Sequence, residues 1–284
     1  MAITHVSDTA RWVAVYRAME SERPDALFRD PYARRLAGSE GERIVATMPQ
    51  GRSMAWAMIV RTAVFDEMIL AAIARDGLTQ VVNLAAGLDA RPWRLALPPT
   101  LRWVDVDFAD VLEYRTTVIG NARPGCEYQT AAADLTDASS RDGLLARLGA
   151  DGRRTLVITE GLLIYLDPAA VGALGTALAA TPGFVSWIID LANPLLLQWM
   201  QRSWGRAVAR ANAPFRFAPA ESVEFFRPLG WEADEVRWGS DESRRLRREM
   251  RLMWLLRFLG RFSSPERREQ YRRMSAFVRL RRTS

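Results

Sequence analysis

Short apolar runs alternate with helix-like segments through the middle of the chain. Runs with strand character fall at 80–86, 101–106, 126–131, 154–159 and 183–190, and the segments between them predict helices at 91–96, 108–119, 140–148 and 168–179. Strands that alternate with helices are typical of a parallel sheet with right-handed crossover connections. The pattern therefore predicts an open α/β sheet.

The sequences on either side of this alternation follow other patterns. Residues 1–60 are expected to form an N-terminal helical cap with helices at 8–20 and 30–36, and a long helix without internal Gly or Pro is expected at 52–76. Residues 193–217 are apolar, carry two tryptophans and fit no strand. We interpret this segment as a helical lid inserted over the sheet.

The alternation resumes after the lid. A helix is expected at 219–228, a strand at 231–238, an Arg-rich helical pair at 241–273 and a last strand at 275–282. A strand that returns after so long an excursion suits an antiparallel strand at the edge of the sheet. We expect one domain over residues 1–284.

The stretch VVNLAAGLDARPWRL, residues 81–95, is the most informative segment. Its apolar run ends in the small-residue turn Ala85-Ala86-Gly87, and a Pro-led helix start follows at Arg91-Pro92. Because no bulky Cβ covers the backbone N–H groups of such a turn, a ligand can approach them closely.

Three acidic residues follow the next three predicted strands: Asp107, Asp134 and Glu160. In an open parallel sheet ligands bind beyond the carboxyl ends of the strands, and an acid about 20 residues past the glycine turn is the usual partner of ribose hydroxyls. Each acid alone could equally be a helix N-cap. Their joint occurrence at successive strand ends favours a nucleotide-binding crevice.

Composition narrows the chemistry. The only histidine is His5, and all 39 basic residues are arginine, which excludes His-centred triads, His-rich metal sites, the phosphate-loop lysine and Schiff-base chemistry. The single cysteine, Cys126, excludes an internal disulfide, and no apolar run approaches the ~20 residues of a membrane span. Because the N-terminus has no apolar signal-peptide core, we expect a cytoplasmic protein. Because histidine and cysteine are so scarce, we expect no bound metal.

The net charge of +6 is concentrated near the C-terminus, where residues 241–284 carry fourteen arginines against five acids. Such a tail suggests nucleic-acid binding. Apolar residues are interleaved with the arginines at helical spacing, so an amphipathic helix with a solvated arginine face is the simpler explanation. Contact with an anionic substrate or a membrane surface is the remaining alternative.

Several motifs in order resemble one known family. They are LFRDPYARRLAG at 27–38, Arg61 in VRTAVFD, NLAAGLDARPWRL at 83–95, VDVDF at 104–108, ADL at 133–135 and TEGLLIYL at 159–166. Together they resemble the leucine carboxyl methyltransferase family, S-adenosyl-L-methionine-dependent O-methyltransferases whose bacterial branch includes tetracenomycin-type polyketide carboxyl methyltransferases. The resemblance implies a Rossmann-like class I methyltransferase sheet of six parallel strands and one antiparallel strand.

The resemblance also implies roles for individual residues. Arg61 would hold the methionine carboxylate of S-adenosyl-L-methionine, Asp107 the ribose hydroxyls and Glu160 the methionine amino group. Ala85, Ala86 and Gly87 would pass under the cofactor, Asp134 and Leu135 would flank its adenine, and Arg11 would be a further cofactor contact. The family usually has Leu-Gly-Ala-Gly where this chain has Leu84-Ala85-Ala86-Gly87. A positive φ at Ala85 would cost ~1 kcal/mol or more, but we expect that only a small residue is needed there.

A carboxylate acceptor is ionised at neutral pH and needs no general base, whereas a phenol, with a pKa of about 10, would use Glu160 or Tyr165. Tyr16, Arg52, Trp199 and Trp204 are expected to line the acceptor pocket. The resemblance implies that the partner is a small carboxylic acid or phenol, such as one from polyketide or antibiotic biosynthesis, free or carrier-bound. We expect no nucleic-acid or membrane partner, and a homodimer is left open.

Two other function classes stay open. A nicotinamide-dependent oxidoreductase could use a similar sheet, but it would usually need a Tyr-Lys pair or a His for proton relay. A non-catalytic or nucleic-acid-binding relative of the methyltransferase fold could use the Arg-rich tail instead, and a weakened cofactor site at Ala85 would be consistent with it.

Overall fold

The computed structural model describes residues 7–48, 51, 54–209, 214–250 and 264–283. Its strands are β1 (Gln80–Leu84), β2 (Arg102–Asp107), β3 (Glu127–Ala132), β4 (Thr155–Thr159), β5 (Phe184–Ala192), β6 (Trp231–Trp238) and β7 (Ser275–Arg282). The helices are α1 (Ser7–Ser21), α2 (Ala33–Thr47), α3 (Ala55–Asp76), α4 (Arg91–Arg94), α5 (Ala109–Ile119), α6 (Ala138–Gly149), α7 (Pro168–Ala180), α8 (Pro194–Ala209), α9 (Gly239–Arg245) and α11 (Pro265–Arg272), with 3₁₀ helices η2 (Leu163–Tyr165) and η3 (Ser222–Leu229).

The seven strands form one sheet in the order β3-β2-β1-β4-β5-β7-β6. β7 is antiparallel to both of its neighbours, and the other strands are parallel to one another. The predicted Rossmann-like sheet of six parallel strands and one antiparallel strand is therefore confirmed.

The expected edge position of the last strand is wrong, because β7 lies between β5 and β6 and the edge strand is β6. The long excursion before β7 suggested an edge strand, but β7 lies inside the sheet, where Arg279 is buried and its guanidinium forms ion pairs with Asp76 and Asp234. Two carboxylates thus compensate a buried charge inside the sheet, which lets an Arg-bearing sequence occupy an interior position.

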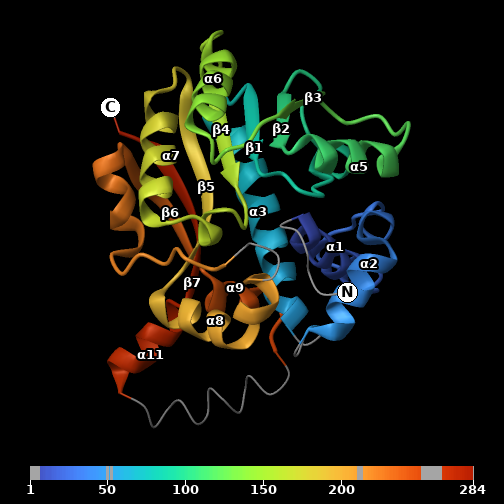
Figure 1. Ribbon diagram of the computed structural model, residues 1–284, viewed down its shortest axis with the longest axis vertical. Helices are drawn as coiled ribbons and strands as arrows, with labels where there is room; N and C mark the ends of the chain where they lie inside the picture. The colour runs from blue at the N-terminus through green and yellow to red at the C-terminus, as the bar shows by residue number, and fades with distance from the viewer. Residues whose placement is uncertain (1–6, 49–50, 52–53, 210–213, 251–263, 284) are drawn as a thin grey trace.

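Helices cover both faces of the sheet, with α6 and α7 on one face and α3 on the other (Figure 1). Alternating residues of each strand serve the two faces: Val82 and Val157 pack with Leu174 of α7, while Val81 and Ile158 belong to the cluster around α3. α3 ends at Gly77, whose φ of 61° provides the left-handed cap that favours glycine. This three-layer arrangement leaves the carboxyl ends of the parallel strands open for a site.

Helices α1, α2, α8 and α9 gather around those carboxyl ends (Figure 1). The predicted helix at 30–36 is instead α2, which continues past Gly38 with a kink there at φ 60° and ψ −177°. The expected lid segment contains α8, and the expected helical pair appears as α9 and α11, with 251–263 outside the described residues. Among the described residues no helix has the length and apolar character needed to cross a membrane.

Candidate functional site

A large cavity opens at the carboxyl ends of the strands, with a volume of about 1720 Å³. Twelve of the residues expected in the site line it: Tyr16, Arg61, Ala85, Ala86, Gly87, Asp107, Asp134, Leu135, Glu160, Tyr165, Trp199 and Trp204. Small-molecule sites commonly measure ~300–1,000 Å³, so this cavity has room for two ligands side by side. Arg52 lies outside the described residues.

The structure does not bring Arg11 to the cavity. Its guanidinium carbon lies 4.1 Å from the ring centroid of Tyr114, and its Nη1 donates to the Tyr114 hydroxyl at 2.7 Å. Neighbouring positions of a helix face different sides. Ala10 and Trp12 line the cavity, whereas Arg11 projects toward α5. The expected cofactor contact at Arg11 is therefore unsupported by its position.

The turn after β1 has two residues in left-handed conformation, Ala85 with φ 54° and Gly87 with φ 53°. Our expectation that position 85 needs only a small residue is wrong, because its backbone adopts the conformation that favours glycine. A Cβ built on Gly87 would lie 3.1 Å from the Cβ of Ala10, so a side chain there would press on α1. The turn is thus narrow and carries strain at Ala85.

Asp107 is fixed against this turn. Its Oδ2 accepts from the Gly87 backbone N–H at 2.6 Å, and its Oδ1 accepts from the Phe108 N–H at 2.8 Å. Burial raises the pKa of its carboxyl above the ordinary value. Because each carboxylate oxygen can accept more than one hydrogen bond, Asp107 retains lone pairs for ligand hydroxyls at the cavity wall. Its position fits the expected ribose contact.

The three strand-end acids are not helix N-caps. α5 is capped by Phe108, α6 by Asp137 and η2 by Leu162. Asp134 instead accepts from the backbone N–H and the hydroxyl of Thr136, which lowers the pKa of its carboxyl. The alternative interpretation of these acids as caps is therefore wrong, and all three line the same cavity.

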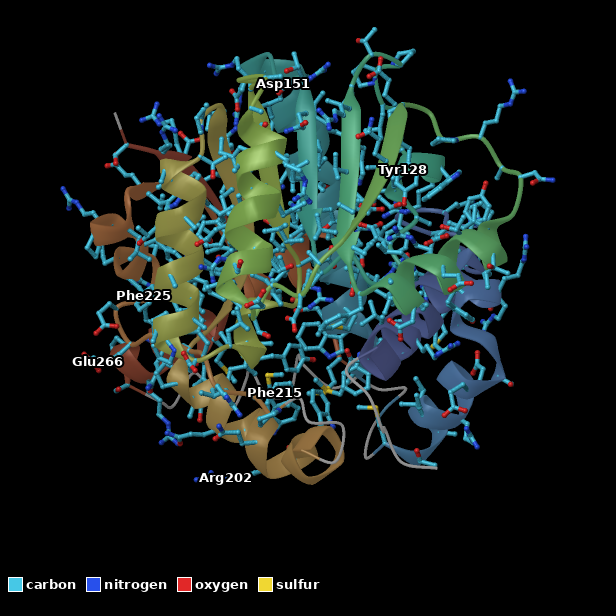
Figure 2. All side chains as sticks on the ribbon, turned by 45° about the horizontal axis from the view of Figure 1, so that its top comes forward. Tyr128, Asp151, Arg202, Phe215, Phe225 and Glu266 are labelled. Atoms are coloured by element: carbon cyan, nitrogen blue, oxygen red, sulfur yellow. The ribbon has the colours of Figure 1, made fainter. Side chains whose placement is uncertain are left out.

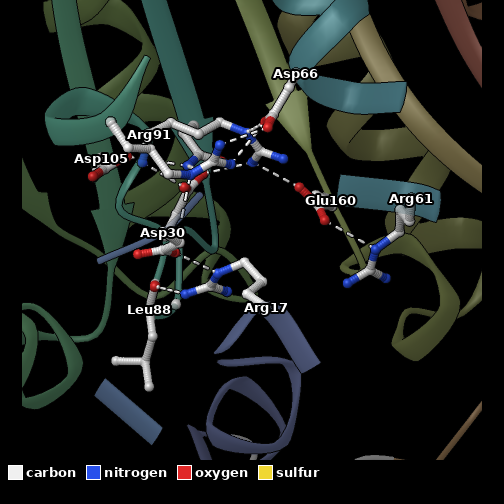
Figure 3. Close-up of polar contacts among 12 residues, drawn as sticks. Arg17, Asp30, Arg61, Asp66, Leu88, Arg91, Asp105 and Glu160 are labelled. Carbon is white, nitrogen blue, oxygen red and sulfur yellow. Dashed lines mark hydrogen bonds and ion pairs between the residues drawn. The ribbon is translucent and has the colours of Figure 1, made fainter. Parts of the chain in front are cut away.

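Arg61 lies between two carboxylates in the wall of the cavity. Its Nε is 3.0 Å from Glu160 Oε1, and its Nη1 is 3.2 Å from Asp190 Oδ2 (Figure 3 draws the first pair). Burial opposes the charge of this guanidinium, but Glu160 and Asp190 outweigh burial and raise the pKa of Arg61. Asp190 also accepts from the Gly161 N–H at 2.7 Å, and burial raises the pKa of its carboxyl.

A second buried arginine, Arg91, extends this charge network behind the turn (Figure 3). Its guanidinium is 2.7 Å from carboxylate oxygens of Asp66, Asp89 and Glu160. Burial opposes the charge of Asp89, but Arg91 and two further arginines lower the pKa of its carboxyl to about 2. Glu160 thus lies between Arg61 and Arg91, each holding one of its oxygens.

The N-terminal helices are tied to the same turn. Arg17 of α1 donates to the Leu88 carbonyl at 2.5 Å and to Asp30 Oδ2 at 2.8 Å (Figure 3). Both Arg17 and Asp30 are buried. α1 is therefore part of the cavity wall and is held there by a charged pair in the interior.

Sequence analysis missed Asp190, Arg91, Asp66 and Arg17. Asp190 could have been found, because it lies near the carboxyl end of a predicted strand, as the three recognised acids do. Arg91 lies in the quoted motif, but its partner Asp66 is on α3, and nothing in the local sequence connects the two. Their pairing depends on how α3 crosses the sheet.

Aromatic and methionine side chains line the part of the cavity between α1 and α8. Trp12 and Trp199 each contact Trp204, with ring centroids 6.4 and 5.1 Å apart, and Tyr165 stacks on Phe215 at 5.5 Å. Figure 2 shows Phe215 near the middle of this region. The methionines are Met48, Met54, Met58 and Met200. We call this set of residues the aromatic lobe.

Two tyrosines in the cavity are held neutral. Burial raises the pKa of both Tyr16 and Tyr165 to about 12. The Tyr16 hydroxyl donates to the Gly51 carbonyl at 2.6 Å, so its proton is already engaged in a hydrogen bond within the protein. Tyr165 is protonated at neutral pH and can donate a hydrogen bond, but its raised pKa opposes a role as a general base. In the described residues no group of three or more His, Cys, Asp or Glu side chains is arranged to hold a metal ion.

Comparisons with known proteins identify the family of this chain. The family model described as leucine carboxyl methyltransferase matches residues 10–179. A Mycolicibacterium gilvum protein assigned as an S-adenosyl-L-methionine-dependent methyltransferase is 34% identical over 256 residues, which cover 80% of this chain and 82% of the relative. A Mycobacteroides abscessus protein with the same assignment is 40% identical over 179 residues, 59% of this chain and 57% of the relative.

Solved structures share the fold. A DUF574 family protein from Streptomyces avermitilis superposes with a TM-score of 0.64 at 15% identity, over 96% of this chain and 97% of that one. A Thermobifida fusca structure assigned as a methyltransferase gives a TM-score of 0.59 at 16% identity, over 96% and 94%. At such identities these structures support the fold alone. From the family match and the relatives, the chain belongs to the leucine carboxyl methyltransferase family, and S-adenosyl-L-methionine is its cofactor.

Proposed function

We propose that this protein transfers a methyl group from S-adenosyl-L-methionine to a carboxylate oxygen of an apolar, aromatic small molecule. The observation that carries the proposal is the continuity of one cavity, which joins Asp107, Arg61 and Glu160 to the aromatic lobe. When bound, the cofactor supplies an electrophilic methyl group on a sulfonium. The chain's own residues have to align the two ligands and exclude water, which can provide most of the acceleration for such a displacement.

The charges around Arg61 suit a zwitterionic ligand end. One guanidinium lies between the carboxylates of Glu160 and Asp190. A ligand with a carboxylate and an ammonium can insert there with every charge still paired, the carboxylate at Arg61 and the ammonium at Glu160. We assign Asp107 to the ribose hydroxyls, and Asp134 and Leu135 to the adenine.

A carboxylate acceptor agrees with the side chains around the transfer point. The chain has no lysine, and its one histidine is His5, which leaves carboxylates, tyrosines and arginines for proton chemistry. Tyr165, with its pKa raised to about 12, is a poor base. An acceptor carboxylate, with an ordinary pKa of about 4, is already ionised and needs no base. A phenol acceptor is the second candidate, because half-buried Asp190 has a raised pKa and faces the cavity.

The aromatic lobe supports the finer assignment to polyketide-type acceptors. Trp12, Trp199, Trp204 and Phe215 offer flat apolar surfaces on which fused aromatic rings can stack. We therefore assign the protein to the tetracenomycin-type branch, as a cytoplasmic enzyme of polyketide or antibiotic biosynthesis that takes a free or carrier-bound acceptor. Trp199 and Trp204 are its acceptor contacts in this assignment.

The cofactor assignment is tested by calorimetric titration with S-adenosyl-L-methionine and S-adenosyl-L-homocysteine. Micromolar binding by the wild type should be lost in Asp107→Ala and Arg61→Ala. Asp151→Ala is the matched control, since Asp151 is exposed and lies at the opposite end of the molecule from Phe215 (Figure 2). Undisturbed binding in both site variants would overturn the assignment.

The acceptor assignment is tested by incubating the enzyme with radiolabelled cofactor and a panel of aromatic acids and phenols. A methyl ester releases labelled methanol in mild alkali, whereas a phenol ether retains its label. Alkali-labile product is expected. Label that survives alkali in every product would contradict a carboxylate acceptor and favour the phenol.

A further inference from the structure

The ion pairs around Arg61 and Arg91 belong to one continuous group of side chains, which we call the charge network. At the cavity wall Asp190 pairs with Arg61, which also pairs with Glu160. Glu160 in turn pairs with Arg91 (Figure 3). The remaining members, joined by ion pairs of 3.9 Å or less, are Asp30, Asp66, Asp89, Arg17 and Arg94. The network thus runs without a break from Asp190 to Arg17 of α1.

This network contains more carboxylates than arginines. Within the described part of the chain it has five carboxylates and four arginines, which gives a formal charge of −1 when all are ionised. Away from the cavity each arginine can be matched with one carboxylate: Arg17 with Asp30, Arg94 with Asp66 and Arg91 with Asp89. Arg61 is then left to balance both Glu160 and Asp190. The surplus negative charge therefore lies at the cavity end of the network.

Asp190 is the less compensated of these two carboxylates. Glu160 is held by two arginines, whereas among the described residues Asp190 has an ion pair with Arg61 only. The side chain of Asp190 is 21% exposed and lines the cavity, so a ligand can approach it. Burial raises the pKa of its carboxyl even though Arg61 lies beside it, which agrees with an incompletely balanced negative charge.

The cofactor and its demethylated product differ by one positive charge in this region. Both have a carboxylate and an ammonium at the methionine end, but only S-adenosyl-L-methionine has a sulfonium as well. With the carboxylate at Arg61 and the ammonium at Glu160, the methionine end is neutral and the surplus charge of the network remains. The sulfonium is joined to the same α-carbon by a short methylene chain. It is therefore the positive charge that can balance the surplus.

We propose that Asp190 is a specificity residue, which selects the cationic methyl donor over the neutral demethylated product. The inference rests on the proposed function, from which it takes the placement of the methionine end. Because Asp190 acts through its charge, it needs no contact with the methyl group. After transfer the surplus is unbalanced again, which favours release of the product. An acceptor carboxylate meets a site without excess negative charge only while the donor is bound, so the network also agrees with a carboxylate acceptor.

The test is calorimetric titration of the full chain with S-adenosyl-L-methionine, sinefungin and S-adenosyl-L-homocysteine. Sinefungin carries an ammonium in place of the sulfonium and has no methyl group to transfer. A unit charge at ~10 Å, with an effective dielectric constant of ~20, changes an affinity by about tenfold. In Asp190→Asn, which keeps the shape of the side chain but not its charge, the affinities for the two cationic ligands relative to S-adenosyl-L-homocysteine should both fall by about tenfold.

Asp151→Asn is the matched control, because it removes one carboxylate from an exposed position remote from the cavity, and its affinity ratios should equal those of the wild type. Retained binding of S-adenosyl-L-homocysteine checks that Asp190→Asn is folded. Glu160→Gln is the second variant, because it removes the other carboxylate beside Arg61. All three ligands carry the same amino-acid ammonium, so the loss of that contact cancels in the ratios, which should again fall by about tenfold.

Ratios that stay unchanged in Asp190→Asn would overturn the assignment. So would a fall for S-adenosyl-L-methionine that sinefungin does not share, because it would depend on the methyl group and not on the charge. The two proposals also fail in different ways. Methyl transfer to aromatic acids, with ratios independent of Asp190, would remove the selection and leave the proposed function. Ratios that depend on Asp190, without methyl transfer to any acid, would keep the selection and remove the proposed function.

Discussion

Replacing Ala85 by glycine should stabilise the protein. Ala85 has a φ of 54°, and an L-residue with a Cβ in this left-handed region costs ~1–2 kcal/mol relative to glycine. Glycine loses more backbone entropy on folding, which offsets ~0.5–1 kcal/mol of the gain. The net stabilisation expected for Ala85→Gly is therefore about 0.5–1 kcal/mol, because the strain exceeds the entropy term.

Thermal unfolding measures this difference. For a chain of this size a gain of 1 kcal/mol raises Tm by roughly 2 °C, so a rise of about 1–2 °C is expected. Ala86→Gly is the control, since the same atoms are removed one residue later, where φ is not positive. That variant should lower Tm, because only the entropy cost and the loss of a buried methyl group remain. A Tm for Ala85→Gly at or below that of Ala86→Gly would refute the strain argument.

Three further predictions concern the cavity and the single cysteine. Gly161→Ala should weaken S-adenosyl-L-homocysteine binding at least about tenfold in calorimetry, because its φ is +68° and a Cβ there would lie 2.8 Å from Arg61 Nη1; unchanged affinity would show that Arg61 does not hold the cofactor. Asp107→Asn should weaken the same binding and change how Tm depends on pH. Burial raises the folded-state pKa of Asp107 above the ordinary 3.8, so the wild-type carboxyl contributes stability below pH 3.8 and loses it as the pH rises through the folded pKa. The Tm of the Asn variant minus that of the wild type should therefore increase from pH 3.8 to 7, and a difference that decreases over this range would contradict the sign. Burial raises the pKa of the Cys126 thiol to about 11, so a disulfide reagent at pH 8 should label the folded protein at least about 100-fold more slowly than the denatured one; equal rates would place the thiol at the surface.

Local pattern predicted most elements of the fold, although it ended the second helix at residue 36, whereas α2 continues past Gly38. The observed bounds of β6 and β7 equal the predicted ranges, and strand-end acids do meet in one cavity. The order of the strands in the sheet could not be predicted from local pattern, because contacts between distant segments determine which strands pair. In the interior strand β7, Arg279 is paired with Asp76 and Asp234, and these three residues are far apart in the chain.

The direction in which a side chain points could not be predicted from the sequence either. Arg11 and Arg61 are both basic positions of the family pattern, yet only Arg61 reaches the cavity. The direction of Arg11 was decided by Tyr114 on another helix, whose ring and hydroxyl engage its guanidinium. The left-handed conformation of Ala85 could not be predicted either, because a small residue is compatible both with a narrow turn and with a left-handed one.

The interior position of β7 has a consequence for biosynthesis. Among the described strands β6 pairs only with β7, and β7 follows β6 by more than thirty residues. A ribosome that has released β6 therefore holds a strand whose hydrogen-bonding edges are both unsatisfied, and β5 has an open side as well. Until Ser275–Arg282 emerges and inserts, the nascent sheet presents unpaired backbone to other chains, which makes this the interval in which chaperone protection matters most.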